Sequence, residues 1–343
     1  MRNMDKFFAG LVLSVLMSVS AAFAQDDVDP EPKKEVAEAT SMIVVAGAPG
    51  TQQYGEQFFE WTIEWEEVAK RSGANYTGIG TSEDASVSSR KQLIKAISSV
   101  SPQAATPLWL VLIGHGTFAD GVAKFNLTGP DVSAKELAEW LAPIKRPVVV
   151  VNCSSSSGPF VNQLSGPRRI VVTATKSGTE ESFAYFGKFF AKAIASPESD
   201  LDHDDEVSVQ EAFLRASAEV KRFYESEGRI ATEHAILDDN GDGKGTPSKM
   251  FRGTRAIAVA KNAEKLDGAV AARVTLSPAG KGLPFTSEEL SRREEIETTL
   301  ERLRLKKSTV TETQYHQEIE PLMIELAKIY RDAERRAKKG GLP

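Results

Sequence analysis

Short apolar segments alternate with helix-like segments through the first two thirds of the chain, and this alternation constrains the fold more than any other feature. The segments that we expect to be strands span residues 42–46, 76–79, 108–113, 148–151 and 169–174. Strands that are apolar along their whole length must be covered on both faces, as in parallel sheets with helices on either side. The alternation therefore predicts an α/β fold of three layers with a mostly parallel central sheet.

Helical spacing of apolar side chains marks the segments between these strands. We expect helices over residues 54–71, 88–100, 133–141, 181–194 and 212–224. Ser88 or Ser89 would cap the second helix. Ser133 and Glu136 have the capping-box spacing at the start of the third. These signals set the order of strands and helices along the chain.

Two reactive side chains follow neighbouring expected strands. His115 lies between two glycines after the strand 108–113, and Cys153, the only cysteine, follows the strand 148–151. Because ligands of open α/β sheets bind beyond the carboxyl ends of the strands, we expect both side chains at one edge. A thiol attacks an acyl carbon as thiolate, so His115 would be its base, and Gly116 would offer an unobstructed backbone N–H as oxyanion donor. The alternative is a buried, inert cysteine.

The two strand-end motifs resemble those of the caspase–legumain clan of cysteine peptidases. An apolar strand that ends in His115-Gly116 is followed by one that ends in a small-residue loop with a cysteine and Ser157-Gly158. The resemblance covers about residues 42–194, and bacterial caspase-like and legumain-like proteins are the most similar. It implies a caspase-haemoglobinase-like fold, with His115 as general base, Gly116 as oxyanion donor and the thiol as nucleophile.

The cysteine motif is shifted by one residue relative to the clan. Counted from Asn152, the nucleophile position holds Ser154, and counted back from the Ser-Gly pair it holds Ser155. A shift of one residue at a strand end turns a side chain to the opposite face. Three hypotheses follow: Cys153 is the nucleophile, a serine replaces it, or the site is inactive and the fold serves binding.

An acidic stretch before the last expected helix of the core has the spacing of an EF-hand-type calcium loop. The candidate metal ligands are Asp200, Asp202, Asp204, Glu206, Ser208 and Glu211. Asp205 stands where such loops have glycine, and the alternative is an acidic helix-capping loop. A second stretch, residues 238–246, copies the first half of such a loop but has Lys249 in place of the final glutamate. We therefore expect Ca²⁺ as the metal and no organic cofactor.

The first 24 residues have the pattern of a secretory signal peptide. Positive Arg2 and Lys6 precede an apolar stretch, and Ala22-Phe23-Ala24 is a cleavage motif. Removal of these two cations together with Asp5 would change the formal charge from −6 to −7. A mildly acidic chain gives no support for nucleic-acid binding, and no segment is long and apolar enough to span a bilayer. We expect an exported protein, periplasmic or extracellular, without stable membrane insertion.

The remaining segments flank one central domain. Residues 25–40 read as a flexible lead-in, 41–260 as the caspase-like α/β domain, 261–285 as a connection, and 286–343 as a helical hairpin with a tail. Apolar residues at helical spacing among dense charges, with a break at 308–313, predict the hairpin. It is either a solvated appendage or a surface for protein contacts.

Two functions fit these observations. The first is a calcium-braced, exported cysteine-type endopeptidase, a hydrolase that cleaves peptide or protein substrates with a Cys/His dyad. The alternative is a catalytically inactive envelope protein of the same fold that binds proteins. A Cys153 sulfur within about 4–5 Å of a ring nitrogen of His115 would favour catalysis, and a Cys153 that points into the core would argue against the cysteine mechanism.

Overall fold

The computed structural model describes residues 38–81, 87–203, 206–261, 263, 265–276 and 283–339. The expected signal peptide and most of the expected lead-in lie outside the described residues. So do Asp204 and Asp205 of the acidic loop and part of the connection, including residues 277–282. The described residues all belong to one compact unit of the chain, residues 35–343.

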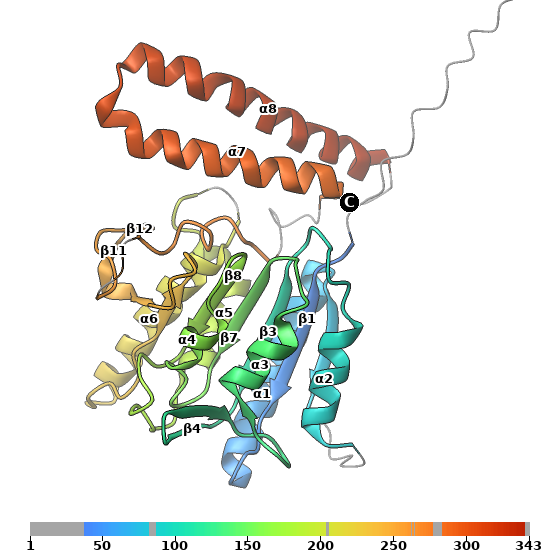
Figure 1. The fold of residues 1–343 in the computed structure, drawn as a ribbon, viewed down its shortest axis with the longest axis vertical. Helices are drawn as coiled ribbons and strands as arrows, with labels where there is room; N and C mark the ends of the chain where they lie inside the picture. Colours follow the sequence, from blue (N-terminus) through green and yellow to red (C-terminus); the bar gives the residue numbers. More distant parts are fainter. Residues whose placement is uncertain are drawn as a thin grey trace, which may run out of the picture. The chain divides into compact units, whose positions relative to one another are not determined.

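A seven-stranded sheet in the order β10-β9-β8-β7-β3-β1-β2 forms the centre of this unit (Figure 1). The strands are β1 (Ser41–Ala46), β2 (Asn75–Ile79), β3 (Leu108–Ile113), β7 (Val148–Asn152), β8 (Arg169–Thr173), β9 (Ile236–Asp238) and β10 (Thr246–Pro247). The first five pair in parallel, whereas β9 runs antiparallel to β8, and β10 antiparallel to β9. The predicted mostly parallel sheet is confirmed.

Helices cover both faces of the sheet, as the apolar strands required (Figure 1). One face packs against α1 (Gln52–Ser72), α5 (Phe186–Ala195) and α6 (Val209–Ser226). The other face packs against α2 (Ser89–Ser99), α3 (Ala134–Leu141) and α4 (Phe160–Leu164). Because successive strand residues point to opposite faces, each strand contributes to both cores. The three-layer α/β fold is confirmed.

Local capping accounts for most helix boundaries. Ser88 accepts the Lys91 N–H at the start of α2. Ser133 and Glu136 form the expected capping box at α3. A second capping box, Ser208 with Glu211, starts α6 at Val209, three residues earlier than the expected 212.

The expected helix 181–194 is wrong at its start, because α5 begins only at Phe186. The carboxylate of Glu233 accepts the backbone N–H groups of Tyr185 and Phe186 at 2.8 and 3.0 Å. A residue almost fifty positions away therefore caps this helix. Residues 174–185 are thus left to form a loop at the carboxyl edge of the sheet.

A small antiparallel sheet after His115 was not expected from the sequence. It consists of β4 (Gly116–Ala119), β5 (Val122–Phe125) and β6 (Val132–Ser133). Asp120 and Gly121, both at positive φ, form the turn between β4 and β5. An Asp-Gly pair between alternating residues is a known hairpin signal, so the sequence did contain it.

The predicted C-terminal hairpin is confirmed as α7 (Ser287–Lys306) and α8 (Glu312–Lys339). Its own apolar core contains Phe285, Ile296, Leu300, Ile329 and Ala333. The described residues also form the short strands β11 (Phe251–Arg252) and β12 (Arg255–Ala256), and 3₁₀ turns at Pro197–Ser199, Ser248–Met250 and Lys307–Thr309. Among the described residues, none of the helices has an apolar stretch that could cross a membrane.

Candidate functional site

His115 lies at the carboxyl edge of the sheet, between β3 and β4. Its ring contacts Tyr54, Phe58 and Phe183 edge-on, with ring centroids 4.9, 5.4 and 5.9 Å away. Its Nε2 lies 3.3 Å from the carbonyl oxygen of Pro49. Since a carbonyl only accepts, Nε2 carries the proton of this hydrogen bond. Burial lowers the pKa of His115, and the Pro49 carbonyl partly opposes this, so the ring is mostly neutral near pH 7.

Cys153 points away from this edge and into the core. Its side chain is 1% exposed and packs on the same face as Val149 and Val151. Gly187 of α5 lies against it, so closely that a Cβ at Gly187 would be 3.1 Å from the sulfur. The hydrogen bonds of His115 and Cys153 run to Pro49 and to Val151 (Sγ to carbonyl oxygen, 4.0 Å) rather than to each other.

The environment of Cys153 also disfavours the thiolate. Burial raises the pKa of its thiol well above the usual range, and the nearby carboxylate of Glu233 raises it further. Reactive cysteines instead have a lowered pKa and partial exposure. The thiol therefore has the character of a buried apolar side chain.

The four serines after Cys153 are also buried, each between 0% and 3% exposed. Ser154 donates to Asn152 Oδ1 at 2.7 Å, and Ser157 shares a hydrogen bond with Thr175 at 3.2 Å. Ser156 adopts a positive φ of 53°, and its buried hydroxyl has no hydrogen-bond partner. None of these three hydroxyl groups forms a hydrogen bond with His115.

Ser155 occupies the N–H group that the sequence assigned to the oxyanion. The backbone N–H of Gly116 donates to Ser155 Oγ at 3.2 Å. The same hydroxyl donates back to the carbonyl oxygen of Gly116, also at 3.2 Å. The expected oxyanion donor is therefore used in an internal contact between two strand ends.

A loop closes over the serines, and we call its residues 174–180 the strap. Ser156 donates its N–H to the carbonyl of Glu180 at 2.8 Å, and Gly158 donates its N–H to Thr175 Oγ1 at 3.0 Å. The approach is so close that a Cβ at Gly158 would lie 2.4 Å from the Lys176 backbone. The strap therefore removes the serines from solvent.

The Glu180 carboxylate holds the far end of the strap. The Glu180 carboxylate lies 2.6 Å from Nδ1 of His234 and 3.4 Å from Nζ of Lys176. It also accepts the backbone N–H groups of both residues. Sequence reasoning missed Glu180, because nothing local in the sequence links it to His234, 54 positions later.

The acidic loop brings together part of the expected calcium ligand set. Carboxylate oxygens of Asp200, Asp202 and Glu211 lie within 4.8 Å of one another. Glu211 also accepts the N–H groups of Leu201 at 2.7 Å and Ser208 at 2.9 Å, which holds the loop against the start of α6. Among the described residues, these three carboxylates lie close enough together to hold a divalent cation.

Two other expected ligands point elsewhere. Glu206 is buried and forms an ion pair with Arg293 of α7 at 3.0 Å. Ser208 exchanges hydrogen bonds with Glu211 as the cap of α6. Asp204 lies outside the described residues, so calcium binding stays a prediction that rests on three of the six candidates.

In the second acidic stretch, the carboxylates of Asp238 and Asp239 accept hydrogen bonds from backbone N–H groups. Asp238 accepts the N–H groups of Gly241 and Gly243 at 3.2 and 3.1 Å. The neighbouring Asp239 accepts three backbone N–H groups from residues 268–271. These carboxylates therefore order the chain between β9 and the hairpin.

Comparisons with known proteins concern the fold alone. No protein-family model and no curated protein matches this sequence. Similar solved structures include the Drosophila initiator caspase Dronc (TM-score 0.40, 15% identity, 69% of this chain and 95% of that chain). They also include caspase-1 from Spodoptera frugiperda (TM-score 0.39, 7% identity, 62% of this chain and 92% of that chain). Both of these proteins are caspases, and the function of this chain must be inferred from the site geometry.

Proposed function

We propose that this chain is a non-catalytic, exported binding protein on a caspase-like α/β fold, with its binding surface around His115. One observation carries the proposal: all five side chains from Cys153 to Ser157 are buried, none more than 3% exposed. A peptidase of the resembled clan needs a nucleophile within reach of both the histidine and the substrate. Export is proposed from the signal-peptide pattern of residues 1–24.

The local packing supports an inactive site independently of exposure. A working Cys153 would have to leave the space between the sheet and Gly187, and its thiolate would have to form where burial opposes the charge. Gly116 would also have to release Ser155 before its N–H could stabilise an oxyanion. Each requirement alone would slow a reaction, and together they favour a site without catalysis.

The surroundings of His115 support a role in binding. Tyr54 and Phe183 stack with ring centroids 4.6 Å apart and are both partly exposed beside His115. Aromatic rings bury a large apolar area, tyrosine adds a hydroxyl group, and both residue types are enriched at protein interfaces. We propose a peptide or protein segment as the partner of these three residues.

Active-site probes test the absence of catalysis. The folded protein is incubated at pH 5 to 9 with a fluorophosphonate, which reacts with activated serines, and with a peptidyl acyloxymethyl ketone, which reacts with activated cysteines. We expect no modification of Cys153 or of the serines from Ser154 to Ser157, in the natural chain and in His115→Ala alike. Modification of any of these residues that disappears in His115→Ala would establish an active site and overturn the proposal.

A displayed peptide library tests binding. We expect it to yield peptides whose affinity falls at least tenfold in Tyr54→Ala and in Phe183→Ala. The matched control is Phe59→Ala, which removes an aromatic ring that is 52% exposed on the same helix as Tyr54. Equal losses in all three variants, or none, would contradict a binding surface at His115.

A further inference from the structure

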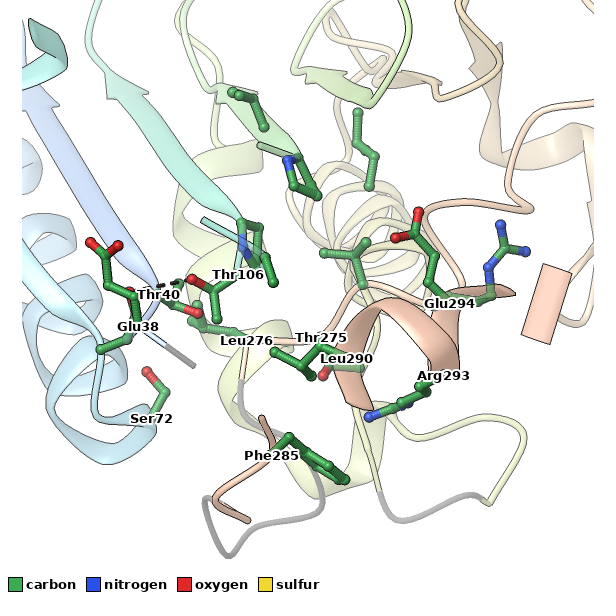
Figure 2. Close-up of a pocket in the computed structure, with 18 of the residues that line it drawn as sticks. Glu38, Thr40, Ser72, Thr106, Thr275, Leu276, Phe285, Leu290, Arg293 and Glu294 are labelled. Atoms are coloured by element: carbon green, nitrogen blue, oxygen red, sulfur yellow. Dashed lines mark hydrogen bonds between the residues drawn. The ribbon is translucent and has the colours of Figure 1, made fainter. Parts of the chain in front are cut away.

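A cavity of about 320 Å³ lies at the edge of the sheet opposite to His115 (Figure 2). Thr40, Thr106, Pro147 and Arg168, which immediately or closely precede the strands β1, β3, β7 and β8, line one side of it. Side chains of α7 line another side. The volume is at the lower end of the range of about 300–1,000 Å³ for small-molecule pockets.

The walls of this cavity are mainly apolar. The contributing side chains come from the sheet, from the segment before the hairpin and from α7: Val148, Ile170, Val274, Leu276, Phe285 and Leu290. In Figure 2, Leu276, Phe285 and Leu290 lie below the strand ends and close the lower side. A ligand without an apolar part would gain no free energy from burying this apolar surface.

Charged side chains around the cavity interact within the protein. Three arginines and three glutamates line it. Arg168 lies 3.9 Å from Glu294, and Arg293 pairs with Glu297 at 2.7 Å as well as with Glu206. Burial lowers the pKa of Arg146, which lies next to the cavity, and the charge of Glu38 opposes part of this lowering. Glu38 therefore has a cation nearby. Arg273 also interacts within the protein.

Hydroxyl groups gather on the side of the cavity away from the ion pairs. Thr40, Ser72 and Thr106 lie there with Glu38, and Glu294 and Arg293 lie on the other side (Figure 2). Thr106 Oγ1 accepts a hydrogen bond from Arg146 at 2.8 Å, which fixes its position. The cavity therefore offers an apolar space with one wall of hydroxyl groups, beside Glu38.

We infer that this cavity binds a small neutral amphiphile, with an apolar chain or ring against Leu276, Phe285 and Leu290 and an uncharged hydrogen-bonding group near the hydroxyls. A ligand with a net charge would have to compete with internal pairs, because Arg168 pairs with Glu294 and Arg293 pairs with Glu297. The inference does not depend on the function proposed for the opposite edge. Since the ligand would contact both the sheet and α7, its binding would stabilise the docked hairpin by mass action.

Three ligands with one chain and different head groups test the charge argument. The purified full chain is titrated with 1-octanol, octanoate or octylammonium, and binding is followed by saturation-transfer NMR and by the shift of the unfolding temperature. We expect saturable binding of 1-octanol and at least tenfold weaker binding of both ions. Tighter binding of either ion, or no saturable binding of 1-octanol, would overturn the inference.

A filled cavity tests the location. Leu290→Trp places a large ring in the cavity, and Met323→Trp, at a position 47% exposed on α8, is the matched control. We expect 1-octanol affinity to fall at least tenfold in the first variant and to stay unchanged in the second. Equal affinity in both variants would contradict the site.

Photolabelling keeps the test independent of the folding of any variant. A diazirine analogue of 1-octanol is irradiated with the natural chain, and labelled residues are mapped by mass spectrometry. Labels on Leu276, Phe285 or Leu290 would support the site, and labels only elsewhere would overturn it.

Discussion

The two edges of the central sheet differ in how their space is used. At the carboxyl edge, where His115 and Cys153 were expected to meet, the strap and the serines fill the space with hydrogen bonds. At the amino edge, α7 covers a cavity of about 320 Å³ whose walls are mainly apolar. The motif residues thus lie at a closed edge, and this cavity lies at the opposite edge, away from the motifs. Residue types in the right order show which fold a chain resembles, whereas catalysis also needs a free space beside them.

The buried ion pair between Arg293 of α7 and Glu206 gives the largest expected effect on stability. Arg293→Met leaves Glu206 buried without its cation, and we expect a loss of about 3–5 kcal/mol in the free energy of unfolding. The control is the adjacent Arg292→Met, because Arg292 pairs with Glu325 at the surface and should matter little. Urea unfolding of both variants measures this difference, and Glu206→Leu combined with Arg293→Met should recover most of it. A loss that is as small in Arg293→Met as in Arg292→Met would contradict a tightly docked hairpin.

Packing around Cys153 tests the closed edge. Gly187→Val adds atoms where the Cys153 side chain lies, and we expect about 1–3 kcal/mol of destabilisation from overpacking. The loss should shrink in a Cys153→Gly background, because that change removes the colliding atoms. Unfolding curves of the two single variants and the double variant give the coupling. Additive effects would mean that Cys153 does not contact Gly187.

The pH dependence of stability tests the buried carboxylate of Glu233, which caps α5. Burial raises the pKa of Glu233 to about 7, and the charge of Glu180 contributes to this increase. The hydrogen bonds from Tyr185, Phe186 and Tyr224 lower the pKa and offset part of the increase. Because the folded pKa exceeds the ordinary value of 4.5, this group stabilises the fold fully below about pH 4.5. That contribution is lost as the pH rises towards 7. Unfolding midpoints between pH 4.5 and 7.5 should fall less steeply in Glu233→Gln than in the natural chain, and equal slopes would contradict the assignment.

Calcium gives the smallest expected effect. If Asp200, Asp202 and Glu211 bind Ca²⁺, the metal should raise the unfolding temperature by a few degrees, and chelation should reverse the rise. Asp202→Asn should abolish this shift, whereas the control Asp242→Asn, in the second acidic stretch, should retain it. Titration calorimetry provides the direct measurement. A shift that persists in Asp202→Asn would place the metal elsewhere.

Most of the sheet could be predicted from the sequence, because apolar runs such as Leu108–Ile113 and Val148–Asn152 carry their own signal. The start of α5 could not, since Glu233, far along the chain, caps Tyr185 and Phe186. The small sheet β4–β6 has a local signal in the sequence, the Asp120-Gly121 turn. Local patterns therefore predicted the layers, and distant contacts decided the boundaries.

The candidate site was predictable only as a set of positions. His115 and Cys153 do follow neighbouring parallel strands, but both faces of the sheet are apolar, so the sequence does not say which way Cys153 points. The hydrogen bond between Ser155 and Gly116 joins residues 39 positions apart. The one between Glu180 and His234 joins residues 54 positions apart. The cavity depends on how α7 packs against the strand ends, which no local pattern encodes.

Alkylation of Cys153 as a function of urea tests the central claim most directly. The folded protein is exposed to iodoacetamide at pH 8 in rising urea below the unfolding transition, and the rate is compared with the free energy of unfolding. We predict that labelling occurs only through global unfolding, so that the logarithm of the labelling rate rises with urea in parallel with the logarithm of the unfolding equilibrium constant. In His115→Ala the rate should change only as much as the change in stability requires. Fast labelling without urea that is lost in His115→Ala would mean an activated thiol, and would contradict a closed, non-catalytic edge.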